Sequence, residues 1–229
     1  MGKSRLVDEG VRMARRLSLA VGVGAAEPSD SVAELAPLLR ALFDGPEPPL
    51  DGAGLSSLHA APEQRYWRLR DLQSLLERAA LDGPLLIFLD DLQWVDSGTV
   101  AALRALPSRL AKLPIGWVLA MRPDQGREQL RSAVEYLVDE GAATLVLEPL
   151  SKPAVMQVAR DAMQAEPDNT LLQMACEAGG NPFLLVELLE GLRQEKLVRV
   201  DSGHATLAAY RLPDRVRASM RERLAGMSG

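Results

Sequence analysis

The chain lacks the sequence features of disulfide-bonded, membrane-spanning, secreted and nucleic-acid-binding proteins. Its 229 residues contain one cysteine, Cys176, so an internal disulfide framework is excluded and a packed thiol is expected. The sequence contains no apolar run of about 18 residues, which a membrane span would need. It also contains no short apolar stretch before a cleavage site, which a signal peptide would need. The net charge of −5 provides no electrostatic footprint for nucleic acid. We therefore expect a cytoplasmic protein that contacts neither membranes nor nucleic acid directly.

Aromatic residues and histidines are also scarce. Aromatics make up 4% of the chain, and the two histidines, His59 and His204, have no cluster of partners that would indicate a metal site. The hydrophobic content of 47% is ordinary for a globular protein. The length suits one large domain, or a core domain with a smaller one.

Strand-like and helical segments alternate along the first two thirds of the chain. Short apolar runs predict strands, and apolar residues three or four positions apart predict helices. This alternation predicts an α/β fold with a parallel sheet and crossover helices. The expected strands are 19–26, 85–90, 115–121 and 143–147, and the expected helices cover 6–17, 32–43, 64–80, 97–113 and 130–137.

From residue 150 onward the pattern changes to short helices without strands, which predicts a small helical lid. Residues 197–200 and 207–212 predict the two strands of a hairpin, and a short helix is expected over 216–224. The expected division is a core over 1–149, a lid over 150–195 and a final region over 196–229.

Residues 85–96 read LLIFLDDLQWVD, an apolar run that ends in two adjacent carboxylates. Such a run suits a parallel strand buried on both faces, and open α/β sheets bind ligands at the carboxyl ends of their strands. There Asp90 is a candidate Mg²⁺ ligand and Asp91 a candidate catalytic residue that polarises a water. This is the Walker B arrangement of nucleoside triphosphatases. The alternative is a buried strand that runs into a solvated acidic turn.

Residues 2–4, Gly-Lys-Ser, match the end of the phosphate-binding pattern GxxxxGK[ST]. In the complete motif, backbone amides and a helix N-terminus hold the phosphates, the lysine reaches the terminal phosphates, and the hydroxyl binds Mg²⁺. Gly2, Lys3 and Ser4 are therefore candidate nucleotide ligands, and Ser4 is also a candidate metal ligand. Because a lone Gly-Lys-Ser is common by chance, an arbitrary N-terminus is the alternative.

Other positions are candidates for contact with a nucleotide or for structural roles. Arg122 follows an expected strand, where a guanidinium either reaches a γ-phosphate or caps the strand in solvent. Pro182, after Gly180 and Asn181, either lies against an adenine ring or simply begins a helix. Trp94 and Asp96 are expected to pack and to cap a helix, respectively.

Taken in order, these residues resemble the ATPase module of STAND-type proteins, a branch of the AAA+ P-loop class. The resemblance is greatest to the large LuxR-type (LAL) bacterial transcription regulators and spans nearly the whole chain. Residues 2–7 resemble the end of their Walker A motif and residues 85–96 their Walker B motif, in which histidine often stands in the place of Gln93. Residues 180–183 resemble their G-x-P motif, and residues 212–224 resemble the start of their winged-helix region.

The resemblance implies a P-loop NTPase-type sheet, a lid and the start of a winged-helix element. It also implies ATP or ADP and Mg²⁺ as ligands, and self-association or contact with other domains of a parent regulator. Asp90 would hold Mg²⁺ and Asp91 would orient the attacking water. Lys3 and Arg122 would contact the terminal phosphates, and Pro182 would contact the adenine.

The chain departs from this family at its start, where the first strand and the front of the phosphate loop are missing. In this class that strand lies between the last strand of the sheet and the strand that precedes Arg122. The sensor repeats and helix-turn-helix domain are missing as well, so we expect a fragment. Three functions stay open: a slowly hydrolysing nucleotide switch, an interaction or structural remnant without a competent nucleotide site, and, less supported, a small-molecule kinase.

Overall fold

A computed structural model describes residues 2–32, 34–51, 65–122, 128–214 and 216–217. The chain divides into two compact units. One comprises Lys3–Leu145, and the other comprises Val146–Gly229 together with Met1–Gly2. Within the described residues, no helix is both long enough and apolar enough to cross a membrane.

The unit formed by Lys3–Leu145 is built on a parallel sheet with the strand order β1–β2–β3. The strands are β1 (Ala20–Ala25), β2 (Leu85–Asp90) and β3 (Ile115–Leu119). The central strand β2 is apolar on both faces, and nearly all of its side chains are buried. This arrangement confirms the expected α/β class with a parallel sheet and flanking helices.

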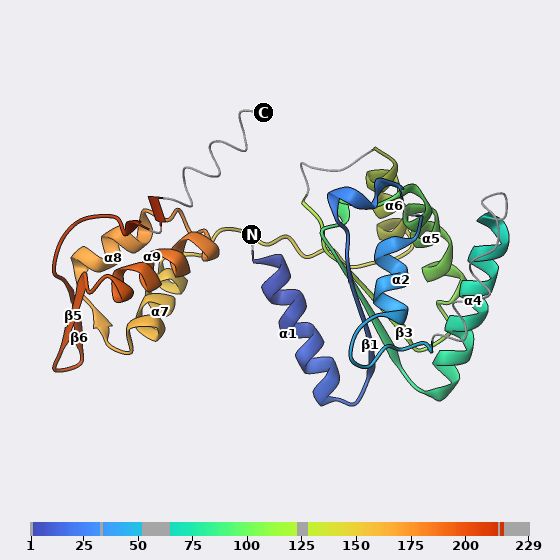
Figure 1. The fold of residues 1–229 in the computed structure, drawn as a ribbon, viewed down its shortest axis with the longest axis horizontal. Coiled ribbons are helices and arrows are strands. Elements are labelled where there is room, and N and C mark those ends of the chain that lie inside the picture. The colour runs from blue at the N-terminus through green and yellow to red at the C-terminus, as the bar shows by residue number, and fades with distance from the viewer. Residues whose placement is uncertain (1, 33, 52–64, 123–127, 215, 218–229) are drawn as a thin grey trace. The chain divides into compact units, whose positions relative to one another are not determined.

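The helices of this unit cover the two faces of the sheet unequally. Helix α1 (Lys3–Arg16) packs on one face, where Val7, Val11 and Ala14 contact Val21 and Phe88. The main core lies on the other face, under four helices (Figure 1). These are α2 (Ala36–Phe43), α4 (Arg65–Asp82), α5 (Ser97–Arg109) and α6 (Glu128–Asp139).

Strand β1 lies unusually close to α2, which explains its two interior glycines. A Cβ atom at Gly22 would overlap the carbonyl oxygen of Ala41, and one at Gly24 would overlap that of Pro37. Side chains at these positions would push the helix away from the sheet. The glycines, which weaken the strand signal in the sequence, are therefore required by the backbone approach.

Two helix expectations needed correction. The helix expected over 6–17 spans Lys3–Arg16, so Leu17 lies beyond its end, and Leu6 and Leu17 are 48% and 65% exposed because α1 buries only a narrow stripe. The helix expected from residue 32 begins at Ala36, since residues 28–32 form a 3₁₀ helix, η1 (Pro28–Val32). Leu35 then adopts a left-handed conformation with φ of 66°, which interrupts any continuous helix.

The strand expected over 143–147 is wrong. Residues 142–151 form no strand, and Leu145 and Val146 are 72% and 74% exposed. An isolated strand has no partner for its backbone amides and carbonyls, and it is not stable by itself. The resemblance places another strand between this segment and β3, so the segment has no neighbouring edge in the described sheet.

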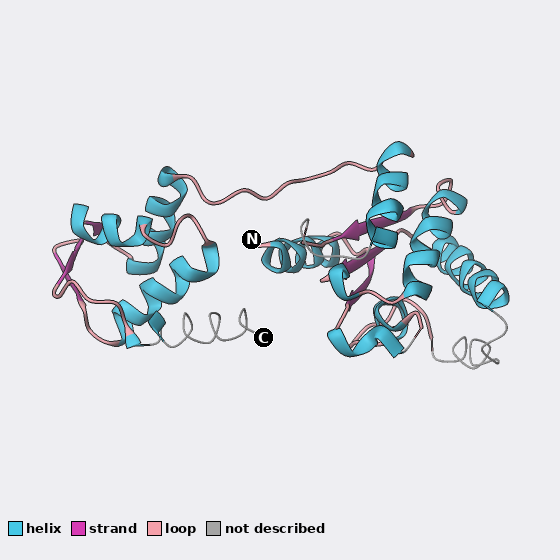
Figure 2. Ribbon diagram, turned by 90° about the horizontal axis from the view of Figure 1, so that it is seen from above, coloured by secondary structure: helices cyan, strands magenta, loops and turns pink. Residues whose placement is uncertain are grey.

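The other unit is mainly helical, with a small sheet (Figure 2). Its helices are α7 (Lys152–Met163), α8 (Asn169–Cys176) and α9 (Pro182–Gln194). A hairpin of β5 (Val198–Asp201) and β6 (His204–Leu207) follows, and a two-residue strand, β4 (Glu166–Pro167), pairs in parallel with β6.

The hairpin was expected correctly, but its second strand was misplaced. That strand begins at His204 rather than at residue 207, because the turn contains only Ser202 and Gly203, both with positive φ. The short strand β4 was not expected. Cys176 is partly buried against the core of this unit, as expected for a packed thiol. The helix expected over 216–224 lies almost entirely outside the described residues.

Candidate nucleotide site at the carboxyl edge of the sheet

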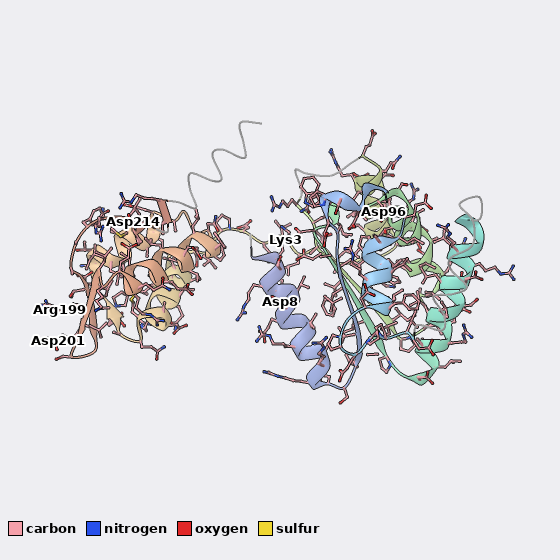
Figure 3. All side chains as sticks on the ribbon, in the orientation of Figure 1. Lys3, Asp8, Asp96, Arg199, Asp201 and Asp214 are labelled. Atoms are coloured by element: carbon pink, nitrogen blue, oxygen red, sulfur yellow. The ribbon has the colours of Figure 1, made fainter. Side chains whose placement is uncertain are left out.

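The topology brings most of the candidate residues to one edge of the sheet. Helix α1 is followed by a short turn and then by β1, so the N-terminus of α1 and the carboxyl ends of the parallel strands lie at the same edge. Lys3 is the first residue of α1, and Figure 3 shows it at this edge. Asp90 ends β2, and Arg122 follows β3. Pro182 belongs to the other unit, so its proximity to these residues stays a prediction.

Asp90 is held firmly by the sheet. It pairs in register with Ala25, and its carbonyl oxygen accepts a hydrogen bond from the amide of Ala26 at 3.0 Å. Its side chain is 8% exposed, and Oδ1 accepts the backbone N–H of Asp91 at 2.7 Å. One carboxylate oxygen is thus engaged by the backbone, and the carboxylate lies at the rim where a ligand would approach the strand ends.

The chain turns sharply at Asp91, directly after the end of β2. Its φ of 50° and ψ of 36° lie in the left-handed region, which aspartate tolerates better than most residues. The side chain is half-buried. The 3₁₀ helix η3 (Leu92–Trp94) begins directly after it, and the amide of Leu92 donates to the carbonyl of Ala120 at 3.1 Å.

Gln93 connects Asp91 to the segment after β3. Its Nε2 donates to Oδ1 of Asp91 at 2.8 Å, and its Oε1 accepts the backbone N–H of Arg122 at 3.3 Å. The side chain is 8% exposed. Sequence reasoning missed this residue as part of the site, because the contact depends on the left-handed turn at Asp91. A polar residue two positions after the acidic pair, directly following the buried Leu92, is the signal that would have drawn attention to it.

Asp96 has the structural role that was expected, and Trp94 is partly covered. The carboxylate of Asp96 is 2% exposed and accepts from Thr99 N–H at 2.8 Å, which caps α5. It also accepts from the Thr99 hydroxyl at 2.6 Å and from Leu35 N–H at 2.8 Å. Trp94, which was expected to pack, is 47% exposed, so only part of its side chain is covered.

The start of α1 has the electrostatic character that favours an anion. The first turn carries Lys3 and no acidic residue, and Arg15 and Arg16 lie in the last turn. The free backbone N–H groups and the positive end of the helix dipole therefore meet at Lys3 and Ser4. Lys3 is half-buried and Ser4 is exposed, and Gly2 precedes them with φ of 81°. One helix turn supplies few of the amides that a complete phosphate loop would provide.

The donor set at this edge fits Mg²⁺ bound together with a nucleotide. Magnesium is usually held by one or two protein oxygens along with phosphate oxygens and waters. Asp90 offers a carboxylate oxygen and Ser4 a hydroxyl, both hard oxygen donors. No group of three or more His, Cys, Asp or Glu side chains suited to a metal occurs in the described parts of the chain. A site formed only by protein ligands is therefore not what this edge offers.

The Gly180-Asn181-Pro182 segment has a complete structural explanation. Gly180 adopts φ of 70°, and its carbonyl accepts the amide of Leu150 at 2.8 Å, so close that a Cβ atom would overlap that residue's backbone. Asn181 is 7% exposed and caps α9 by accepting from Phe183 N–H at 3.1 Å. Pro182 occupies the first helical position, where its missing N–H costs nothing.

A comparison with protein families matches residues 1–119 to the AAA ATPase domain, which covers more than half of the chain. The chain belongs to the AAA ATPase domain family. Membership in this family makes it a P-loop, nucleotide-binding module, and the matched region contains every candidate site residue except Arg122 and Pro182. No curated protein matches the chain.

Solved structures similar to this chain include two variants of RuvB from Thermotoga maritima. One carries an arginine-to-alanine substitution and shares 14% identity at a TM-score of 0.37, covering 67% of this chain and 57% of that one. The other carries a lysine-to-arginine substitution and shares 15% identity at a TM-score of 0.35, covering 66% of this chain and 49% of that one. The chain thus spans about half the length of these structures.

Proposed function

We propose that this chain is the ATP-binding switch module of a signal-responsive bacterial transcription regulator of the LuxR-type, STAND class. It binds ATP with Mg²⁺ and hydrolyses it slowly. The observation that carries the proposal is the meeting of Asp90 and Asp91 with Lys3 at one edge of a parallel sheet. Family membership supports nucleotide binding, and the assignment to regulators rests on the motif resemblance.

The proposed roles follow from the placement of each residue. Lys3 and Arg122 contact the terminal phosphates, and the helix N-terminus at Gly2 and Ser4 supplies amides and a hydroxyl. Asp90 with Ser4 holds Mg²⁺, which neutralises phosphate charge when it is bound. Asp91 orients the attacking water, and Arg122 stabilises charge on the terminal phosphate. Pro182 contacts the adenine from the helical unit.

The switch is a change in the balance between two arrangements of the core and the lid. A ligand changes such a balance only through its different affinity for the two states. A change from 1:99 to 99:1 requires a difference of about 5.5 kcal/mol, or roughly 10⁴-fold in affinity. The division into core 1–149, lid 150–195 and winged-helix start 196–229 is part of this proposal. Other domains of the parent regulator, or a second copy, would receive the signal.

Titration calorimetry with ATP and Mg²⁺ tests the proposal directly. We expect Lys3→Ala to weaken ATP binding by about 10-fold to 100-fold, because a charged contact to phosphate is lost. Lys112→Ala is the matched control, since Lys112 lies just before β3 at the opposite edge of the sheet and is exposed. Equal affinities for both variants, or no binding by the unaltered chain at millimolar ATP, would refute nucleotide binding at this edge.

A second candidate is an interaction or structural remnant without a competent nucleotide site. It is favoured by the described sheet, in which β3 pairs with β2 alone, and by the segment around Leu145 and Val146, which is exposed and forms no strand. Under this proposal the chain is truncated within the Walker A motif. A longer chain that carries a preceding strand and glycine-rich loop discriminates the two. Binding of ATP by the longer chain but not by this one would establish the second candidate.

A further inference from the structure

The side-chain amide of Gln93 makes a hydrogen bond through its nitrogen and another through its oxygen. Its N–H group donates to the carboxylate of Asp91, and its carbonyl oxygen accepts from the backbone of Arg122. The loop after β2 and the segment after β3 are therefore joined by one side chain. Gln93 also lines a small cavity of about 10 Å³ with Val95, Ser97, Val100, Gln129 and Leu130, and the cavity has no room for a ligand.

The two contacts of Gln93 depend on each other. An amide has a donor at one end and an acceptor at the other, and a rotation by 180° would exchange them. The oxygen would then face the Asp91 carboxylate and the NH₂ group would face the Arg122 N–H. Both contacts would become repulsive, so only one orientation is compatible with these partners. The bond to Arg122 thereby fixes the direction in which Gln93 donates to Asp91.

We propose that Gln93 is a positioning residue for Asp91. It holds one carboxylate oxygen, Oδ1, so that Oδ2 is left to orient a water, and it ties this orientation to the backbone of Arg122. The inference rests on the proposed function, because it assigns a role within the same hydrolytic site. Both ends of the Gln93 amide are engaged by protein groups, so its effect is expected on turnover rather than on affinity.

The first test replaces Gln93 with methionine, which fills similar space but cannot hydrogen-bond either partner. We expect the kcat for ATP hydrolysis to fall by about tenfold or more, because the water-orienting carboxylate loses its fixed direction. The ATP dissociation constant should stay within about twofold of the original value. The matched control is Gln129→Ala. Gln129 lies on α6 and lines the same cavity, and the hydrogen bond to Asp91 comes from Gln93 instead.

The second test is Gln93→His, which distinguishes positioning from packing. A neutral imidazole offers one donor and one acceptor, as the amide does, whereas an imidazolium offers two donors and no acceptor. The histidine variant should therefore retain most of the turnover at pH 8 and lose it as the imidazole becomes protonated, because an imidazolium can no longer accept the N–H of Arg122. The methionine variant should show no such transition. A role in packing alone would not make the rate depend on pH in this way.

A nucleotide-free measurement separates failure of this inference from failure of the proposed function. Hydrogen exchange at the Arg122 amide should become about tenfold faster in Gln93→Met and stay unchanged in Gln129→Ala, because this N–H donates to the side chain of Gln93. If the unaltered chain binds no ATP, the proposed function fails, and the bridge is judged on this exchange rate. Exchange that is unchanged in Gln93→Met, or equal losses of turnover in both variants, would overturn the inference.

Discussion

Replacement of Asp96 by alanine should destabilise the unit formed by Lys3–Leu145 more than any other single truncation of an acidic side chain in it. The carboxylate is 2% exposed and accepts three hydrogen bonds. Two of these come from Thr99 at the start of α5 and one from Leu35, whose backbone has φ of 66°. Asp96 therefore caps one helix and holds the strained residue that precedes another, α2.

The magnitude follows from the donors that would be left without a partner. A buried donor without an acceptor costs about 1–3 kcal/mol, and loss of an aspartate cap costs about 0.5–2 kcal/mol. The contributions are not additive, because Oδ1 serves both Leu35 and Thr99. We expect a loss of about 3–5 kcal/mol for Asp96→Ala. Asp96→Asn keeps the shape and an acceptor oxygen and should lose about 1–2 kcal/mol.

Urea denaturation followed by tryptophan fluorescence is the appropriate assay. All three tryptophans, at positions 67, 94 and 117, lie in the unit that contains Asp96, so the signal reports on that unit alone. With a slope of about 2 kcal/mol per molar urea, the midpoint should fall by about 1.5–2.5 M. The control is Asp168→Ala, which removes the cap of α8 in the other unit and should leave this transition unchanged. If Asp96→Ala lowers the urea midpoint by less than about 0.5 M, the reasoning is refuted.

Two further predictions concern packing and charge. Gly24→Ala should lower the free energy of unfolding of the same unit by about 2–3 kcal/mol in urea denaturation, because the new Cβ would overlap the Pro37 carbonyl. Val23→Ala, at an exposed neighbouring position, should lower it by less than about 1 kcal/mol. The hydrogen bonds from Arg160 at 2.6 and 2.8 Å lower the pKa of Glu166, so Arg160→Gln should raise that pKa in an NMR titration. The stabilisation by this exposed pair should be present above pH about 4.3 and fade as the pH falls through the lowered pKa; an unchanged titration would contradict the assignment.

A strand could be predicted from the sequence where its own residues are apolar enough to indicate burial. The run 85–90 is apolar at every position before its terminal carboxylate, and no other element is needed to indicate a central strand. The cap at Asp96 and the proline at the start of α9 were equally local signals. The arrival of Lys3, Asp90 and Arg122 at one edge followed from the alternation of strands and helices, since that alternation implies a parallel sheet.

The remaining features depend on partners that a local pattern does not contain. Residues 143–147 have the composition of a strand, yet a strand needs a neighbouring edge, and Leu145 stays exposed without one. The start of α2 depends on the left-handed turn at Leu35, which the distant carboxylate of Asp96 holds. The contact between Gln93 and Asp91 likewise requires a left-handed residue and the end of another strand.

The two halves of the candidate site are held in place by different means. Asp90 and Asp91 are positioned by the register of β2 and by Gln93, and neither contact involves α1. The amides and the lysine proposed to bind phosphate come from the first turn of α1, which lies on the face of the sheet opposite the main core. Loss of phosphate contacts should therefore lower nucleotide affinity without moving the acidic pair. The carboxylates can remain correctly placed in a chain that binds nucleotide weakly, and for this reason affinity and turnover have to be measured separately.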